Sequence, residues 1–157
     1  MERILVIDDD EKILDNISKA LRLEGYDVDV ANTGRMAIER SERRFYNLAI
    51  IDFRLPDMEG TELLTVLKTT TPTMVKIILT GYPTVQNSIK AINNGVDAYL
   101  TKPVEMDVLI KTIKEHLLKQ SKENEFDEGK VADYIETRLR KLNDYPPVNS
   151  ELTTGSD

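Results

Sequence analysis

Four segments with a strand-like pattern, three of them aliphatic runs, lead into residues that could take part in chemistry. The first segment is followed by three acids that begin with Asp8, the second by Asp52, the third by Thr80 and the fourth by Lys102. Carboxylates can hold a divalent cation or act as nucleophiles, an ammonium can bind phosphoryl oxygens, and a hydroxyl can donate a hydrogen bond. These residue types favour metal-assisted phosphoryl chemistry if the fold brings them together.

Asp52 is our candidate for the reactive carboxylate. The unbroken aliphatic run 48–51 is typical of a central parallel strand buried on both faces, and Pro56 and Gly60 mark the loop that follows. Ligands of open α/β sheets bind outside the carboxyl ends of the strands, which is where Asp52 would lie. An isolated Asp after a strand is more often a loop opener or helix N-cap, so the assignment depends on its neighbours.

Asp8, Asp9 and Asp10 place three carboxylates at the end of another strand. If Asp8 and Asp9 lie near Asp52, the repulsion between these groups is relieved by a raised pKa or by a bound cation. A hard divalent ion, Mg²⁺ above all, suits a site made only of oxygen ligands. Asp10 can instead be a helix N-cap, because a helical pattern of apolar residues begins at Glu11.

Strand and helix patterns alternate along residues 1–120, which we expect to form one domain. Short aliphatic or alternating runs are separated by stretches with helical spacing, and glycines or prolines close the segments. We expect strands at 3–7, 26–31, 47–52, 75–79 and 97–101, and helices at 11–23, 34–44, 62–68, 84–94 and 104–119.

This alternation predicts an α/β fold, a five-stranded parallel sheet with helices on both faces. We expect the strand order 2-1-3-4-5. In this order strands one and three are neighbours, so Asp8, Asp9 and Asp52 converge at the topological switch point. The fourth and fifth strands then bring Thr80 and Lys102 to the same rim of the sheet.

Residues 121–157 have a different pattern. Residues 121–130 are polar and charged and predict an acidic linker, residues 131–142 carry apolar residues at helical spacing, and the remainder predicts a frayed terminus. We therefore expect a short, amphipathic C-terminal helical tail. A helix of about a dozen residues is marginal alone, so it should dock on its own domain, on a partner or on a second copy.

Composition excludes several classes of function. The 157 residues include no cysteine, which rules out disulfides, thiolate metal sites and a cysteine nucleophile, and makes the cytoplasm the simplest location. The formal net charge is −7, and neither part of the chain has the basic surface that nucleic-acid binding requires. No segment reaches the roughly 18 apolar residues of a membrane span. We expect contact with neither nucleic acid nor membrane.

Four stretches together resemble the signature of the response-regulator receiver domain of two-component signalling. These stretches are 6–10, 50–52 with Pro56 and Gly60, 78–81, and 99–103, and they occur in the order of the family over roughly residues 1–120. Residues 79–82 and 95–103 are most similar to receivers of the nitrogen-regulatory kind.

The resemblance implies that Asp52 accepts a phosphoryl group from the phosphohistidine of a sensor kinase or phosphotransfer protein. It also implies that Asp8, Asp9 and Asp52 hold Mg²⁺ together with the main-chain carbonyl of Arg54, and that Lys102 binds the phosphoryl group. The module would then have no enzymatic activity beyond phosphorylating and dephosphorylating itself.

The resemblance further implies a switch. Thr80 would move toward the phosphoryl group, Tyr99 would rotate inward behind it, and the peptide bond between Lys102 and Pro103 would be cis. The surface of the fourth helix, fifth strand and fifth helix would change and be read by a downstream effector protein. A homodimer through this surface or the tail is a further possibility.

Two alternatives remain open from the sequence. A haloacid-dehalogenase-like phosphatase would use Asp8 and Asp10, but Lys12 stands where that family has a threonine, and Asp52 would have no role. The chain could also be the receiver part of a longer transcriptional regulator.

Overall fold

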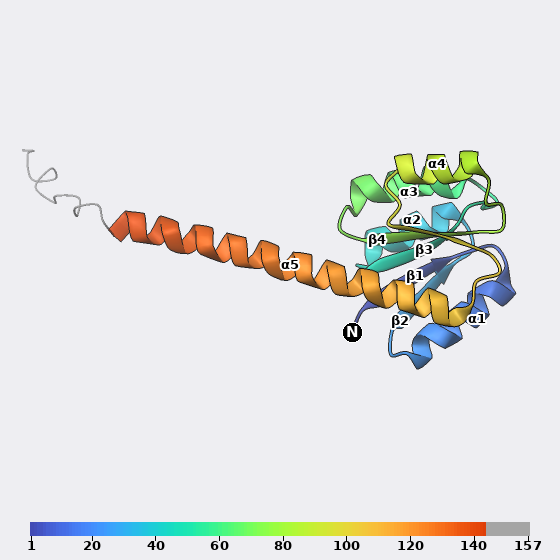
Figure 1. Cartoon of the computed structure of the whole chain (residues 1–157), viewed down its shortest axis with the longest axis horizontal. Helices are drawn as coiled ribbons and strands as arrows, with labels where there is room; N and C mark the ends of the chain where they lie inside the picture. Colours follow the sequence, from blue (N-terminus) through green and yellow to red (C-terminus); the bar gives the residue numbers. More distant parts are fainter. Residues whose placement is uncertain (144–157) are drawn as a thin grey trace, which may run out of the picture. The chain divides into compact units, whose positions relative to one another are not determined.

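A computed structural model describes residues 1–143 of the chain (Figure 1); the expected frayed terminus, residues 144–157, lies outside the described residues. The strands are β1 Arg3–Ile7, β2 Asp27–Ala31, β3 Leu48–Asp52, β4 Val75–Thr80 and β5 Ala98–Thr101. The helices are α1 Glu11–Leu23, α2 Gly34–Arg43, α3 Gly60–Thr70, α4 Val85–Asn93 and α5 Met106–Asn143.

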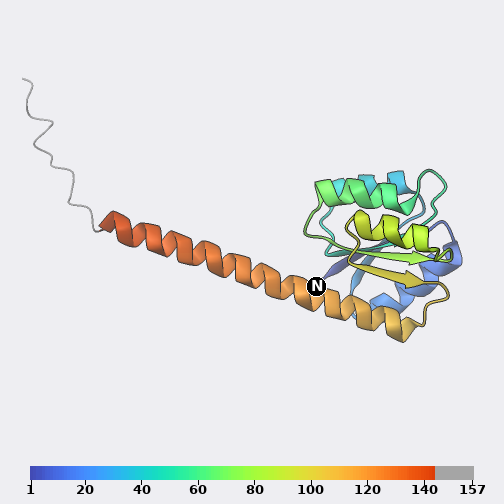
Figure 2. The same cartoon turned by 45° about the horizontal axis from the view of Figure 1, so that its top comes forward.

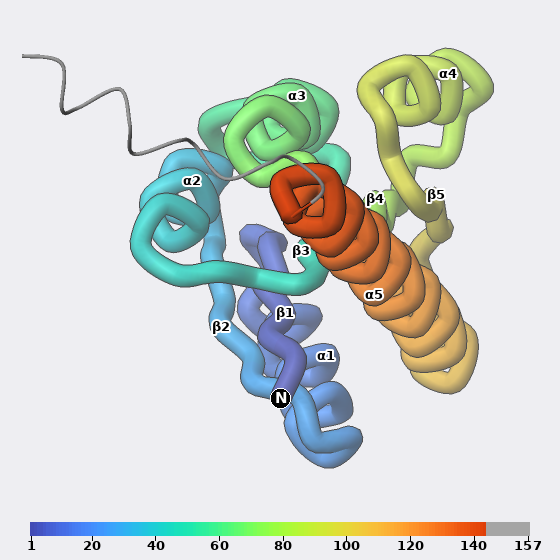
Figure 3. Tube along the Cα trace, turned by 90° about the vertical axis from the view of Figure 1, so that its left-hand side faces the viewer, coloured from blue at the N-terminus to red at the C-terminus, as the bar shows by residue number. Residues whose placement is uncertain are grey.

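The five strands form one parallel sheet in the order β2-β1-β3-β4-β5, which confirms the predicted fold. β3 and β4 are buried at every position, as their aliphatic sequences predict for central strands covered on both faces. Figure 2 and Figure 3 show α2, α3 and α4 on one face of the sheet, with α1 and the first turns of α5 on the other.

Each face of the sheet has its own apolar core. On one face, residues such as Leu5 and Ile51 pack with Leu63, Leu64 and Leu67 of α3 and with apolar residues of α2 and α4. The core on the other face joins the sheet to α1 and α5, through residues that include Ile4, Ile50, Ile17, Leu21, Leu109 and Ile113. The sheet is therefore held rigidly between two layers of helices, and its carboxyl edge is a fixed platform for a site.

Glycines allow two of the helix ends that the sequence predicts. Gly25 follows α1 with φ of 94°, and Gly95 follows α4 with φ of 79°, which is the left-handed region that side chains with a Cβ rarely adopt. Gly60 has a different role, because a Cβ there would collide with the carbonyl oxygen of Asp52. The start of α3 can approach the end of β3 only without a side chain at this position.

Helix α5 differs from the predicted tail. It runs without interruption from Met106 to Asn143, so residues 121–130 are helical and do not form the expected linker. The physical reason is that lysine and glutamate are good helix formers, and a single glycine, Gly129, weakens a helix without ending it. The chain divides into two compact units, Met1–Gln120 and a second that begins at Ser121, and each is described by itself.

Gln120 closes the first unit. Its side chain is buried, and its amide nitrogen donates hydrogen bonds to the carbonyl oxygens of Asn47 and Thr73, at 2.9 and 2.8 Å. These bonds tie α5 to the segments that lead into β3 and β4. Within residues 1–143, none of the helices combines the length and apolarity needed to cross a membrane.

Candidate functional site

The register of the sheet brings the candidate site residues to one edge. Ile7 of β1 pairs with Ile51 of β3, so Asp8 and Asp52 are the next residues on neighbouring strands. Thr80 likewise follows Leu79, the partner of Asp52. On β5, Thr101 pairs with Thr80 and precedes Lys102, so the ends of four parallel strands bring these residues to a single rim, as the sequence predicts.

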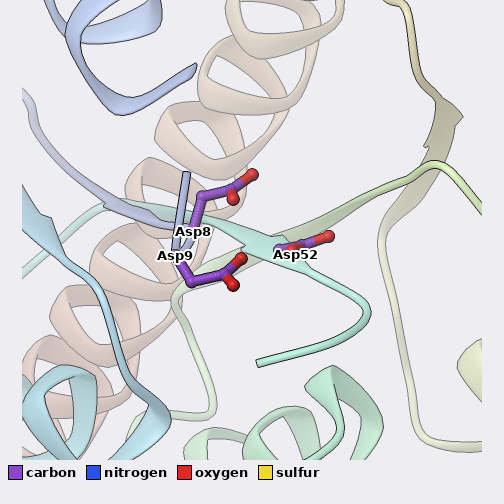
Figure 4. A group of neighbouring side chains, drawn as sticks. All are labelled: Asp8, Asp9 and Asp52. Carbon is purple, nitrogen blue, oxygen red and sulfur yellow. The ribbon is translucent and has the colours of Figure 1, made fainter. Parts of the chain in front are cut away.

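Three carboxylates meet at this rim. Asp8, Asp9 and Asp52 each offer an oxygen that lies within 4.8 Å of the other two, and Figure 4 shows their side chains gathered together. Asp8 and Asp52 are buried, whereas Asp9 is exposed. Such a cluster of hard oxygen donors could hold a metal ion.

Lys102 joins two of these acids. Its ammonium nitrogen lies 2.7 Å from Asp8 Oδ2 and 3.2 Å from Asp52 Oδ1. Its backbone N–H donates to the carbonyl oxygen of Thr80, at 2.7 Å, and the peptide bond to Pro103 is cis, as expected. The hydrogen bond to Thr80 holds the backbone of Lys102 at the end of β4, on the rim that carries the carboxylate cluster.

Burial and charge act together on the titration of the site. Burial, and then the neighbouring charge of Asp8, raise the pKa of Asp52 from 3.8 to about 6, against the opposing effect of Lys102. Burial alone would lower the pKa of Lys102, but its hydrogen bond to Asp8 and the charge of Asp52 outweigh this and raise it. The cluster thus has three carboxylates and one ammonium, which contacts Asp8 and Asp52, and the remaining negative charge favours binding of a cation.

The two expected switch residues lie on the neighbouring strands β4 and β5. Thr80 is fully buried, and its hydroxyl oxygen accepts a hydrogen bond from the backbone N–H of Tyr82, at 2.9 Å. Tyr99 lies on β5 and packs against the core that α3 and α4 share, and its hydroxyl has no hydrogen-bond partner among residues 1–143. Tyr99 pairs with Ile78, two residues before Thr80, and neither hydroxyl bonds to Asp52.

Arg54, whose main-chain carbonyl was expected to be a metal ligand, lies in the loop directly after Asp52. Its guanidinium stacks over the ring of Tyr82, 3.9 Å from the centroid. This contact links the loop after β3 to the loop after β4, on either side of the site.

Asp10 is not part of the carboxylate cluster, because its side chain bonds to the start of α1. Its side chain accepts hydrogen bonds from the backbone N–H groups of Lys12 and Ile13, so it is the N-cap of α1. A phosphatase that used Asp8 and Asp10 as a pair would need this side chain to turn toward the site.

Asp57 was missed by reasoning from the sequence. It accepts hydrogen bonds from the backbone N–H groups of Gly34 and Arg35, both at 2.9 Å, and so fastens the loop after β3 to the start of α2. These bonds lower the pKa of Asp57 although burial acts in the opposite direction. Its partners are 23 and 22 residues away, so no local pattern could have indicated them.

Comparison with known proteins agrees with this geometry. Residues 4–114 match the family model of the response regulator receiver domain. A CheY-like receiver domain protein from Methanospirillum hungatei JF-1 is 46% identical, with a TM-score of 0.77 over 78% of this chain and 98% of that one. The beryllofluoride-activated NtrC4 receiver domain dimer is 33% identical, with a TM-score of 0.73 over 76% and 99%.

Among curated proteins, the transcriptional regulatory protein ZraR of Klebsiella oxytoca is 36% identical over 114 residues, which are 73% of this chain and 26% of the relative. The chain thus spans about a quarter of the length of this relative. The family match, the sheet order and the receiver structures all agree, and the chain belongs to the response regulator receiver domain family, with neighbours of the nitrogen-regulatory type.

Proposed function

We propose that the chain is a phosphoacceptor response regulator in which Asp52 accepts a phosphoryl group from the phosphohistidine of a sensor kinase or phosphotransfer protein. The observation that carries the proposal is the position of Asp52. It is a buried carboxylate at the end of a central strand, with the ammonium of Lys102 at 3.2 Å and an oxygen of each of two further acids within 4.8 Å.

In the transfer, a carboxylate oxygen of Asp52 attacks phosphorus as the P–N bond to the imidazole breaks, and the bonding electron pair leaves with the imidazole nitrogen. Lys102 exchanges its contacts with Asp8 and Asp52 for the phosphoryl oxygens. Asp8, Asp9, Asp52 and the carbonyl of Arg54 would hold Mg²⁺, which neutralises charge on the transferring group when bound. The donor set, oxygen only, suits this ion.

Phosphorylation acts on the rest of the molecule through Thr80 and Tyr99. The hydroxyl of Thr80 leaves the N–H of Tyr82 to donate to a phosphoryl oxygen, and Tyr99 moves into the space behind it. To convert a population from 1:99 to 99:1, the phosphoryl group must favour the active state by about 5.5 kcal/mol. A charged group bound by an ammonium and a cation can supply energies of this size.

The moving surface is that of α4, β5 and the first turns of α5. Helix α4 leaves Val85, Ile89 and Ile92 more than half exposed. Few residues therefore hold this helix to the core, and its apolar face is available to a binding partner. We propose that a downstream effector protein reads this face. A second copy is another reader, as the NtrC4 receiver forms a dimer when beryllofluoride-activated.

The test is incubation with a small acyl-phosphate donor with and without Mg²⁺, followed by intact-mass measurement. The proposal expects one added phosphate per chain that requires Mg²⁺ and is absent from Asp52→Asn. Steady turnover of phosphate esters that survives Asp52→Asn but is lost in Asp8→Asn would support the phosphatase instead. Salt-sensitive binding of the unmodified chain to duplex DNA would contradict a read-out through proteins.

A further inference from the structure

The second unit carries an apolar stripe on the helix of residues 121–143. Five large side chains on this helix are each more than half exposed, and apart from one adjacent pair they follow one another three or four positions apart: Val131, Tyr134, Ile135, Leu139 and Leu142. This spacing places them on one face of an α-helix. A contiguous exposed apolar face of this kind is characteristic of an interaction surface.

The charges of the same helix are separated along its length. Acids outnumber bases in the first half, which holds Glu123, Glu125, Asp127 and Glu128 beside Lys122 and Lys130. Bases outnumber acids in the second half, which holds Arg138, Arg140 and Lys141 beside Asp133 and Glu136. The helix is thus acidic toward residue 121 and basic toward residue 143. In a second copy that runs antiparallel to the first, the basic end lies beside the acidic end of the first copy, so the two charge distributions are complementary.

Positions along the stripe indicate which alignment of two copies is favourable. A seven-residue repeat places Glu128, Ile135 and Leu142 at one interface position and Val131 and Arg138 at the other. In a parallel pair, Glu128 would face Glu128 and Arg138 would face Arg138, so like charges would meet at the centre.

In an antiparallel pair centred near Asp133, the same positions are complementary. Glu128 of one copy meets Arg138 of the other, and Val131 meets Ile135. At the flank, Asp127 meets Lys141. Each contact occurs twice about a two-fold axis, as an isologous interface requires.

We propose that residues 121–143 associate with the same segment of a second copy as an antiparallel helix pair. The self-complementary order of acidic, apolar and basic residues is what selects a second copy as the partner. The interface belongs to the second unit alone, so the proposal stands apart from phosphorylation of Asp52.

The orientation can be tested because the chain has no cysteine of its own. In the antiparallel pair, Ala132 lies beside Ala132 of the second copy, whereas the two Asn124 residues are about 27 Å apart along the axis. With a short bismaleimide cross-linker, Ala132→Cys should form covalent dimers and Asn124→Cys should not. Dimers from Asn124→Cys alone would overturn the proposal in favour of a parallel pair, and dimers from neither would overturn association.

The charge pairing can be tested by sedimentation of the full chain. Glu128→Arg and Arg138→Glu should each weaken self-association at least tenfold, and an equimolar mixture should restore it, because both central pairs are then opposite in charge. Glu136→Arg is the matched control, since Glu136 pairs with Arg140 of its own helix at 2.7 Å, away from the stripe. Equal self-association of the wild type and the three variants would contradict the proposed interface.

Discussion

At the scale of single residues, the site is partly buried and carries more negative than positive charge. The cluster of Asp8, Asp9 and Asp52 is contacted by one ammonium, that of Lys102, which pairs with Asp8 and Asp52 and whose side chain is 20% exposed. The folded site therefore keeps a net negative charge, and binding of a cation or attachment of a phosphoryl group changes that charge. The free energy of unfolding and its dependence on pH should both reflect this charge.

Asp52→Asn should stabilise the protein in chelator above pH 6. The pKa of Asp52 rises from 3.8 in the unfolded chain to about 6 in the folded one, so the wild type loses stability as the pH rises between these values. The difference corresponds to as much as about 3 kcal/mol. Chemical denaturation at pH 3.5 and pH 7.5 should show the gain only at the higher pH.

Asp57→Asn is the control with the opposite sign. The pKa of Asp57 is lowered, so its carboxylate adds stability above the ordinary pKa of Asp and loses that contribution as the pH falls. Asp57→Asn should therefore destabilise the protein at pH 7.5 and have little effect at pH 3.5. The same sign for both variants would contradict the assigned environments.

Lys102→Met should destabilise the protein at pH 7.5 in chelator by about 2 kcal/mol, because it leaves two buried carboxylates without their counter-charge. Added Mg²⁺ should raise the free energy of unfolding of Lys102→Met by more than it raises that of the wild type. Lys114→Met, which breaks the exposed ion pair with Glu24, is the matched control and should have little effect. Denaturant titrations of the three proteins, with and without Mg²⁺, make the comparison.

At the scale of elements, the position of Asp52 depends on how closely α3 approaches β3. The N–H of Gly60 donates to the carbonyl oxygen of Phe53 at 2.6 Å, and Leu55 donates to the carbonyl oxygen of Met58 at 3.1 Å. The loop between strand and helix is thus tightly closed, and Gly60 is the position that permits it.

Gly60→Ala should lower stability by about 1–3 kcal/mol and reduce phosphate labelling, because the added methyl collides with the backbone at Asp52. Gly81→Ala, at the end of β4, is the matched control, since a Cβ there meets nothing within 4 Å. Thermal melts and labelling yields should separate the two variants. Equal behaviour would show that the loop relaxes around the methyl group.

Much of this arrangement follows from the sequence because strand ends are local signals. The alternation of strand and helix patterns predicts the sheet order, and the aliphatic runs that stop at Asp8, Asp52 and Thr80 then predict the rim on which these residues meet. The bonds of Asp57 depend on two distant segments, and the continuity of α5 through residues 121–130 is a balance of helix propensities. No short pattern in the sequence determines either of these features.

At the scale of the whole molecule, the account predicts that a divalent cation stabilises the folded state. A ligand at 100 times its dissociation constant adds about 2.7 kcal/mol when it binds only the folded protein. Mg²⁺ should raise the melting temperature of the wild type, and Asp9→Asn, which changes an exposed carboxylate of the cluster, should lose most of the rise. Glu11→Gln, an exposed acid outside the cluster, should keep it.

Mapping the phosphoryl group to a single residue decides whether Asp52 is the phosphoacceptor. The chain is labelled with an acyl-phosphate donor in Mg²⁺ and reduced with borohydride, which converts an aspartyl phosphate to homoserine, and its peptides are then sequenced by mass spectrometry. We expect homoserine at position 52 and at no other aspartate. Homoserine at position 8 or 9, or a phosphate that resists reduction, would contradict it.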